Sequence, residues 1–329
     1  MNLNIEKIKE ITRGAEKIES TDNGIYFSRF TDSELTASTS PNVRASAGIQ
    51  MDFLTDAVAI DISVFVKKTL SIRTYFCLEI FVDDKPYDTI KNFEEENMTG
   101  NYADVSTNPL GEFSKKIKLS SGEKKIRIIF PHSVATYLKN IELVGATYIT
   151  PVKRNKKILM YGDSITQGFD AIYPTNTFAM RLSDTLSAEL FNKGIGGELF
   201  CPKLVMAENY IKPDYVFVSY GTNDWGFSDK ETFEKNSKLF LETVSKKYDY
   251  TTVYVLTPIW RKDHLAEKLF GSIFDVEKII VNHAKNFSNL KIIPGWDFVP
   301  HNENYYGDLR LHPNDKGFEY MFKNVYNSL

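Results

Sequence analysis

The second half of the sequence alternates between short apolar runs and longer stretches whose apolar residues recur at helical spacing. In the stretch 231–247, for example, Phe233, Phe240 and Val244 fall on one helix face, with lysines and glutamates elsewhere. Such alternation predicts βαβ units, which build a parallel sheet with right-handed crossovers and covering helices. The predicted strands are 158–161, 215–219, 252–256 and 290–293, with 189–192 as a further candidate, and the predicted helices are 176–187, 202–211, 231–247, 273–286 and 315–327.

Residues 1–150 show a different pattern. Their apolar residues come in short runs separated by turn signals, and no long helical pattern interrupts them. Strands at this spacing predict an all-β sandwich. The runs are 25–27, 57–66, 75–82, 113–119 and 125–130. The polar stretch 96–110 predicts a long loop, and 150–155 has the composition of a linker. We therefore predict a β-sandwich domain over 1–150 and an α/β domain over 151–329.

The predicted strand 158–161 is followed at once by Gly162, Asp163 and Ser164. A serine at the turn between a strand and a helix lies at the carboxyl edge of the sheet, where open α/β folds form their binding sites. Such a serine can supply both an attacking hydroxyl and a backbone N–H for a developing oxyanion. An ordinary polar turn would have the same composition, so this tripeptide alone does not identify a catalytic site.

Three further motifs follow in order along the chain. They are NKGIGG at 192–197, YGTND at 220–224 and DLRLHPND at 308–315. In order and spacing, the four motifs resemble the sequence blocks of the SGNH (GDSL-type) hydrolases, a family of serine esterases and lipases. The resemblance covers about residues 155–329. It implies a flavodoxin-like, three-layer α/β fold for this part of the chain.

The resemblance also implies roles for individual residues. Ser164 would be the nucleophile and His312 the general base, because a histidine that titrates near neutrality can take the serine proton and return it to the leaving alcohol. The oxyanion donors would be the backbone N–H groups of Ser164 and Gly197 and the side-chain amide of Asn223. Glycine leaves its N–H open to an acyl oxygen, and an amide donates without adding charge.

The acid partner of His312 departs from the family pattern. The family usually places an aspartate three residues before the histidine, but Leu309 occupies that position here and Asp308 lies four before. Asp308 can still reach the imidazole if the loop bulges by one residue. Alternatively, a backbone carbonyl orients the ring and the enzyme uses a dyad. We favour the triad, because a carboxylate is the commoner partner of a catalytic histidine.

Four residues near the motifs are candidates for binding the substrate: Asp163, Trp225, Trp260 and Arg261. Aromatic rings at the carboxyl edge of the sheet suit stacking on a sugar, and an arginine can bind a polar or acidic group. Both tryptophans are equally compatible with packing at the rim of the core.

The β-rich half resembles the jelly-roll module that precedes the catalytic domain in some carbohydrate esterases of this family. The predicted function is therefore hydrolysis of small acyl esters, most simply acetyl esters of a carbohydrate. One alternative is a lysophospholipase or thioesterase, which needs a continuous apolar groove. Another is a non-catalytic carbohydrate-binding protein with a degenerate hydrolase domain. All four motifs follow residue 155, so we expect the second half alone to supply the catalytic groups.

The composition and the absence of certain motifs argue against several other classes of protein and binding site. The net charge of −3 gives no electrostatic reason to bind nucleic acid or an anionic membrane. No run of eighteen apolar residues is present, and the charged N-terminus has no signal-peptide core. With Cys77 and Cys201 as free thiols, we expect a cytoplasmic protein. No metal-ligand spacing or complete dinucleotide fingerprint occurs, so we predict neither a metal nor a cofactor. The expected partner is a small-molecule or oligosaccharide acyl ester, and the oligomeric state stays open.

Overall fold

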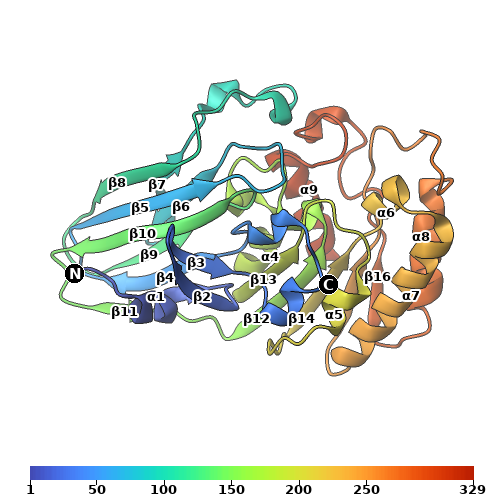
Figure 1. Cartoon of the computed structure of the whole chain (residues 1–329), viewed down its shortest axis with the longest axis horizontal. Coiled ribbons are helices and arrows are strands. Elements are labelled where there is room, and N and C mark those ends of the chain that lie inside the picture. Colours follow the sequence, from blue (N-terminus) through green and yellow to red (C-terminus); the bar gives the residue numbers. More distant parts are fainter.

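The computed structural model describes residues 1–329, which form three β-sheets and their surrounding helices (Figure 1). Two sheets are antiparallel and use strands from the first half of the chain, and the third is parallel and uses strands from the second half. The prediction of a β-rich first part and an α/β second part with a parallel sheet is confirmed at this level.

The antiparallel sheets contain eleven strands between them. Across sheet A they are β2 (Lys17–Thr21), β3 (Gly24–Ser28), β10 (Ala135–Val144), β5 (Ala59–Lys67) and β8 (Glu112–Lys118). Across sheet B they are β1 (Thr12–Arg13), β4 (Gln50–Thr55), β9 (Lys124–Ile129), β6 (Cys77–Val82) and β7 (Lys85–Lys91), and β11 (Ile149–Pro151) also pairs with β4.

One apolar core joins the two antiparallel sheets. Buried residues alternate along β5, as a strand with one buried face requires, and Ile62 and Val64 of this strand share a core cluster with Ile80 of β6 and Ile126 of β9. The helical segments of this half are short: α1 (Ile5–Ile11), α2 (Asp32–Leu35), and the 3₁₀ turns η1 (Pro41–Arg44), η2 (Glu95–Asn97) and η3 (Tyr102–Asp104).

The parallel sheet, sheet C, has a strand order that sets the position of the site. Its strands in spatial order are β13 (Ala188–Gly194), β12 (Lys156–Gly162), β14 (Tyr215–Ser219), β15 (Val253–Leu256) and β16 (Leu290–Ile293). The chain leaves β12 for β13 on one side and then returns to β14 on the other side. Such a switch point opens a crevice at the carboxyl ends of the strands.

Helices cover both faces of sheet C (Figure 1). Leu159 and Tyr161 of β12 share a core with α5, α7 and α8, whereas Ile158 and Met160 share a core with α4 and α9. The helical segments of this half are α3 (Ser164–Gln167), η4 (Pro174–Asn176), α4 (Phe178–Thr185), α5 (Pro202–Met206), α6 (Thr222–Phe227), α7 (Lys230–Lys247), α8 (Ile273–Ala284), η5 (Glu303–Tyr305) and α9 (Asp315–Asn327). The predicted α/β alternation is therefore confirmed.

Buried charges connect the first half of the chain to β13. The Nζ atom of Lys193 lies 2.7 Å from a Glu34 carboxylate oxygen and 2.9 Å from one of Glu16, and the Lys193 side chain is fully buried. Arg29 donates hydrogen bonds of 2.7 and 2.8 Å to the carbonyl oxygens of Asn192 and Gly194. Burial lowers the pKa of Arg29 to about 10. The end of β13 is thus held by residues that precede sheet C.

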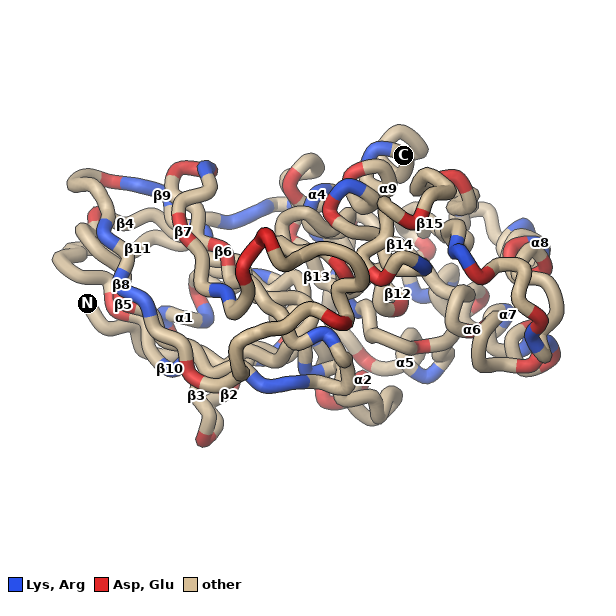
Figure 2. The backbone as a smooth tube through the Cα atoms, turned by 90° about the horizontal axis from the view of Figure 1, so that it is seen from above, with Lys and Arg blue, Asp and Glu red and all other residues tan.

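Acidic and basic residues are interspersed along the whole chain, in line with its small net charge (Figure 2). None of the helices combines the length and the apolar character that crossing a membrane requires.

Candidate active site

Ser164 lies where β12 gives way to α3, at the carboxyl edge of sheet C. The preceding residue, Asp163, caps the helix, because its carboxylate accepts a 2.9 Å hydrogen bond from the N–H of Ile165. Gly194 on the adjacent strand lets α3 lie directly on β13, since a Cβ there would be 2.4 Å from the backbone nitrogen of Gln167. Ser164 is thereby fixed by its own turn and by the neighbouring strand.

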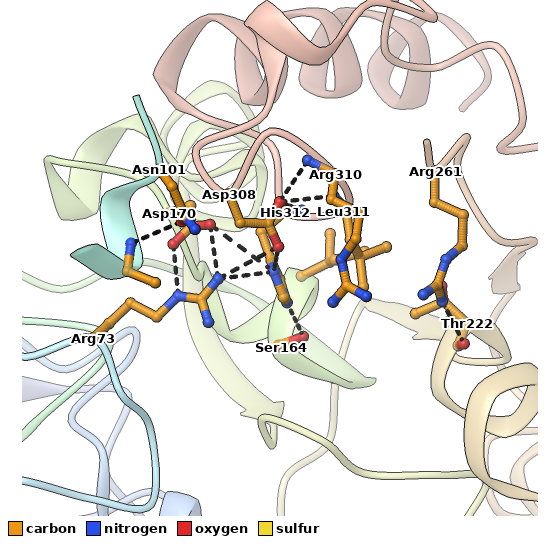
Figure 3. Close-up of polar contacts among 12 residues, drawn as sticks. Arg73, Asn101, Ser164, Asp170, Thr222, Arg261, Asp308, Arg310, Leu311 and His312 are labelled. Carbon is orange, nitrogen blue, oxygen red and sulfur yellow. Dashed lines mark hydrogen bonds and ion pairs between the residues drawn. The ribbon is translucent and has the colours of Figure 1, made fainter. Parts of the chain in front are cut away.

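The structure brings Ser164, His312 and Asp308 together (Figure 3). The Oγ atom of Ser164 is 2.7 Å from Nε2 of His312, and Nδ1 of the same ring is 2.7 Å from Oδ2 of Asp308. These distances correspond to two hydrogen bonds in series. The serine, the imidazole and the carboxylate therefore have the relative geometry of a nucleophile, its base and the group that orients the base.

A left-handed residue explains how an aspartate four positions before the histidine reaches the ring. Leu309 has φ = 55°, which turns the chain back immediately after Asp308. The Oδ1 atom of Asp308 then accepts hydrogen bonds from the backbone N–H groups of Arg310, Leu311 and His312, at 3.0, 2.7 and 3.0 Å. The loop therefore closes around this carboxylate and leaves Oδ2 for the imidazole.

Asp308 is ionised in this environment. Burial by itself raises the pKa of the carboxyl, but the hydrogen bond and charge of His312, together with the backbone N–H donors, outweigh it. The net result is a pKa of Asp308 well below its usual value. An ionised carboxylate only accepts hydrogen bonds, so it favours the tautomer of His312 that carries its proton on Nδ1 and leaves Nε2 free to face Ser164.

Gly197 and Asn223 lie on the same cavity as Ser164. Gly197 has φ = 83°, and no atom lies within 4 Å of the position a Cβ would take, so its backbone conformation, not space, is the reason for glycine. The side-chain amide of Asn223 donates one 3.1 Å hydrogen bond to the carbonyl oxygen of Glu198, which follows Gly197 directly. That bond orients the amide and leaves its second proton available to a ligand.

The cavity has a volume of about 390 Å³ and receives residues from both halves of the chain. It is lined by Asn42, Leu70, Ser164, Phe169, Gly196, Gly197, Asn223, Gly226, Phe227, Arg261, Lys268, Arg310, Leu311 and His312. No aspartate or glutamate lines it. Asn42 and Leu70 belong to the first half, which therefore forms part of the cavity wall, whereas the five candidate catalytic residues all belong to the second half.

Three of the four predicted substrate-binding residues do not line the cavity. Trp225 is buried in the core, where its indole N–H donates a 2.8 Å hydrogen bond to the carbonyl oxygen of Gly271. Trp260 packs against Tyr306, and Asp163 caps α3. The expected stacking of a sugar on the tryptophans is therefore not found; the alternative of core packing describes both. Arg261 does line the cavity.

Sequence analysis missed the arginine nearest to His312. Arg73, in the segment before β6, forms hydrogen bonds of 2.8 and 3.0 Å with the two carboxylate oxygens of Asp170 (Figure 3). Its Nη2 atom also lies 3.1 Å from Nδ1 of His312 and 3.5 Å from Oδ2 of Asp308. No local motif marks Arg73, and only the packing of the two halves brings it here.

Asp170, Asp308 and His312 have possible metal-ligand atoms within 4.8 Å of one another. The guanidinium of Arg73 already pairs with both carboxylates, at 2.8 and 3.5 Å. The residues are thus charge-compensated by an arginine, and this arrangement fits an ion-pair network better than a metal site.

A larger cleft of about 1200 Å³ lies between β6, β7 and α4, and none of its lining residues belongs to the four motifs. In its wall, Arg127 and Arg154 form ion pairs with Asp184, with N–O distances of 2.7 and 2.8 Å. The Arg127 pair joins β9 of sheet B to α4, and Arg154 lies in the connection between β11 and β12. We therefore assign the cleft to the contact between the two halves of the chain, and the chemistry to the smaller cavity.

Comparison with known proteins agrees with this geometry. Residues 160–320 match the model of the GDSL-like lipase/acylhydrolase family. The family model thus recognises this part of the chain. The sequence-based recognition of an SGNH (GDSL-type) hydrolase is thereby confirmed. No curated protein matches the chain significantly.

Several solved structures share the whole fold. A salicylyl-acyltransferase from a tetracycline biosynthetic pathway has a TM-score of 0.77 at 16% identity, covering 96% of this chain and 93% of its own. A putative GDSL-like lipase from Bacteroides ovatus has a TM-score of 0.74 at 18% identity, covering 97% and 95%. An acetyl xylan esterase from the rumen bacterium Butyrivibrio proteoclasticus has a TM-score of 0.63 at 12% identity, covering 99% and 97%. At these identities, the similarity establishes the fold of both halves and not the substrate.

Proposed function

We propose that this GDSL-type hydrolase is a serine esterase that removes small acyl groups, with Ser164 as nucleophile, His312 as general base and Asp308 as the residue that orients the base. The observation that carries the proposal is the series of two 2.7 Å contacts from Ser164 through His312 to Asp308. A serine becomes nucleophilic when a positioned imidazole accepts its proton, and here the imidazole is held by an ionised carboxylate.

In the first half of the reaction, Nε2 of His312 takes the proton from Ser164 Oγ, which attacks the acyl carbon. The resulting oxyanion accepts hydrogen bonds from the N–H groups of Ser164 and Gly197 and from the amide of Asn223. As the tetrahedral intermediate collapses, the C–O bond to the alcohol breaks and His312 gives its proton to the leaving oxygen. The acyl group remains on Ser164.

In the second half, a water molecule attacks the acyl-enzyme and His312 accepts one of its protons. Collapse of the second intermediate breaks the bond to Ser164 Oγ and returns the proton to that oxygen. The products are the carboxylic acid and the free alcohol, and the enzyme is regenerated.

The cavity favours a small, oxygen-rich ester over a long-chain lipid. Its volume of about 390 Å³ is at the low end for ligand pockets. Only Leu70, Phe169, Phe227 and Leu311 give it apolar surface, whereas Lys268 and Arg310 offer hydrogen-bond donors. Arg261 already donates to Asp263 and Thr222. Solved structures with this fold include an acetyl xylan esterase and a family two carbohydrate esterase in complex with cellohexaose. We therefore propose acetyl removal from a carbohydrate.

We also propose that the chain divides near residue 150 into a jelly-roll-like accessory domain and the hydrolase domain. Every strand of sheets A and B lies between residues 12 and 151, and sheet C begins at Lys156. The residues between β11 and β12 supply the short connection.

The proposal is tested by comparing 4-nitrophenyl acetate, a long-chain 4-nitrophenyl ester and an acetylated oligosaccharide, each with wild-type protein and with Ser164→Ala. We expect the two acetyl esters to be hydrolysed, the long-chain ester to react poorly, and Ser164→Ala to lose about 10³-fold or more in turnover. Preference for the long-chain ester would support the lipase or thioesterase alternative. No hydrolysis of any ester, with retained binding of the oligosaccharide, would support the binding-protein alternative.

A further inference from the structure

The first half of the chain reaches the candidate catalytic residues through the segment that leads into β6. Arg73 lies in this segment, its side chain is about one-tenth exposed, and its guanidinium sits between Asp170 and the pair of His312 and Asp308 (Figure 3). The backbone on either side is fixed by side chains: the N–H of Arg73 bonds to Ser71 Oγ at 3.0 Å, and that of Phe76 bonds to Asn92 at 2.9 Å. Arg73 is therefore held by the β-rich half and extends into the active site.

Two carboxylates lie near one imidazole nitrogen of His312, and only one of them can accept the hydrogen bond from Nδ1. Oδ2 of Asp308 lies 2.7 Å from Nδ1, and Oδ2 of Asp170 lies 3.9 Å from the same atom. The Asp170 side chain is fully buried, and besides Arg73 it accepts a 3.0 Å hydrogen bond from the hydroxyl of Tyr75. Without Arg73, Asp170 would be a buried carboxylate with only the Tyr75 hydroxyl as a partner, and it would compete strongly for any nearby hydrogen-bond donor.

Other charged groups lie around this pair. Besides Asp308 and Asp170, a third carboxylate, that of Asp163 in the turn before α3, interacts electrostatically with His312. Burial raises the pKa of Asp163 to about 6. The cavity is also lined by the cations Arg261, Lys268 and Arg310, of which Arg261 and Arg310 pair with Asp263 at 2.6 and 3.3 Å. Of all these groups, Arg73 is the one placed between the two carboxylates that compete for Nδ1 of His312.

The aromatic ring of Phe169 contacts both the imidazole of His312 and the guanidinium of Arg73. The ring of Phe169 lies 5.7 Å from the imidazole of His312, centroid to centroid, and the Arg73 guanidinium lies 5.5 Å from the same ring. The Arg73 guanidinium and the His312 imidazole thus pack against the same Phe169 ring, which limits the movement of either group.

We propose that Arg73 is a positioning residue of the active site: it holds Asp170 in a two-point ion pair, so that His312 bonds to Asp308 alone and keeps Nε2 directed at Ser164. This inference rests on the proposed function and goes beyond it, because it makes the β-rich half part of the catalytic centre. A planar guanidinium suits the task, since its parallel N–H groups match both oxygens of a carboxylate.

The consequence for catalysis follows from charge. Without the guanidinium, Asp170 is an uncompensated second carboxylate beside the imidazole. It would pull the Nδ1 proton away from Asp308 and favour the imidazolium, which cannot accept the serine proton. The reacting geometry would suffer at the same time, and misplacement by about 1 Å can cost roughly 10²-fold in rate.

Four variants separate this role from a purely structural one: Arg73→Gln, Arg73→Lys, Asp170→Asn and the double variant Arg73→Gln/Asp170→Asn. We expect Arg73→Gln to lose about 10- to 100-fold in kcat on 4-nitrophenyl acetate, with KM changed less than about twofold. The acidic limb of its kcat/KM profile should move to higher pH. Arg73→Lys, which keeps a cation, and the double variant, which removes the competing carboxylate, should recover most of the activity. Asp170→Asn alone leaves no carboxylate to compete with Asp308, so the acidic limb of its profile should not move to higher pH.

A spectroscopic readout keeps the inference independent of the reaction. The proton that His312 shares with Asp308 should give a low-field ¹H NMR resonance in the wild type, in Arg73→Lys and in the double variant, and Arg73→Gln should shift or lose it. Asp308→Asn is the control that removes the resonance in any case. If Ser164→Ala leaves esterase activity intact, the proposed function fails, but this resonance still tests Arg73.

Two results would overturn the role of Arg73. One is an unchanged resonance and pH profile in Arg73→Gln. The other is a double variant as impaired as Arg73→Gln itself, which would mean that the guanidinium supports the fold and not the choice between carboxylates. Should Arg73→Gln fail to fold, Arg73→Lys and the double variant decide the question by the same resonance, since neither leaves a buried carboxylate unpaired.

Discussion

Leu309 shows how one backbone angle changes the meaning of a motif. An aspartate four residues before the histidine departs from the family pattern, yet the left-handed conformation of Leu309 brings it within 2.7 Å of the imidazole. The sequence analysis therefore favoured Asp308 as the partner of His312 but left a backbone carbonyl as the alternative, because the conformation of a single non-glycine residue has no reliable local signal.

The triad assignment predicts a large effect of Asp308→Asn. Turnover on 4-nitrophenyl acetate should fall about 10⁴-fold with the fold retained, because an amide at this position no longer enforces the Nδ1–H tautomer of His312. Circular dichroism and thermal unfolding check the fold, and His312→Ala serves as the control for complete loss of the base. A loss below about tenfold would instead indicate that a backbone group orients the ring.

Asn223→Ala should lower kcat by about 10²- to 10³-fold and leave KM nearly unchanged. In the proposed mechanism the amide meets charge that develops only as Ser164 attacks, so its removal should affect the transition state more than the bound substrate. Steady-state kinetics on a small acetyl ester measure both constants. A rise confined to KM would assign Asn223 to ground-state binding.

At the scale of elements, prediction succeeded where the pattern was regular. Four strands of sheet C were predicted and β13 was named as a further candidate, because short apolar runs lie next to helical stretches. The long strand β10 was missed, and its pairing with β5 shifts register between Leu138 and Asn140, which breaks the alternation that marks a strand. β4 was missed for another reason: its polar residues Gln50 and Asp52 are buried, so it lacks an exposed face.

A contact between two elements predicts how stability depends on pH. Glu79 of β6 accepts hydrogen bonds of 2.8 and 2.8 Å from the N–H and the hydroxyl of Thr175 in η4, and burial raises its pKa to about 7. The folded protein therefore binds this proton more tightly than the unfolded chain does. The stabilisation is present below about pH 4 and is lost as the pH rises through about 7, by on the order of 3 kcal/mol at most.

We expect Glu79→Gln, which resembles the protonated side chain, to reduce this dependence. Thermal unfolding at pH 5 and pH 8 should show a smaller fall in Tm for Glu79→Gln than for the wild type. Other buried carboxyls with raised pKa values, such as Asp224 at about 7, are common to both proteins and cancel in the comparison. An equal fall in Tm would mean that Glu79 is ionised in the folded protein throughout this range.

At the scale of the whole molecule, the position of the motifs says little about how the two halves depend on each other. All four motifs follow residue 155, and from the sequence alone a chain beginning near Asn155 is predicted to hydrolyse small esters if it folds by itself. The structure leads to the opposite expectation, because such a chain lacks Asn42 and Arg73 and leaves Lys193 without its buried carboxylate partners. Long-range packing of this kind has no periodicity or spacing by which sequence analysis could detect it.

We therefore predict that the truncated chain, if it is obtained in solution, has at least tenfold lower turnover than the full chain on 4-nitrophenyl acetate. Circular dichroism establishes whether it folds. The matched control is the full chain carrying Arg73→Gln, which isolates the loss of one residue from the loss of the entire β-rich half. Full activity in a folded truncated chain would show that the first half is dispensable for chemistry.

The buried pair of Lys193 and Glu34 also constrains how the protein is made. The two residues are separated by 159 positions, so at about 5 to 20 residues per second Glu34 is synthesised roughly 8 to 32 s before its partner. Throughout that interval its carboxylate has no cation to neutralise it and is best left in water. We therefore expect the surface around Glu34 to remain exposed to solvent during synthesis until β13 has been made and packs against it.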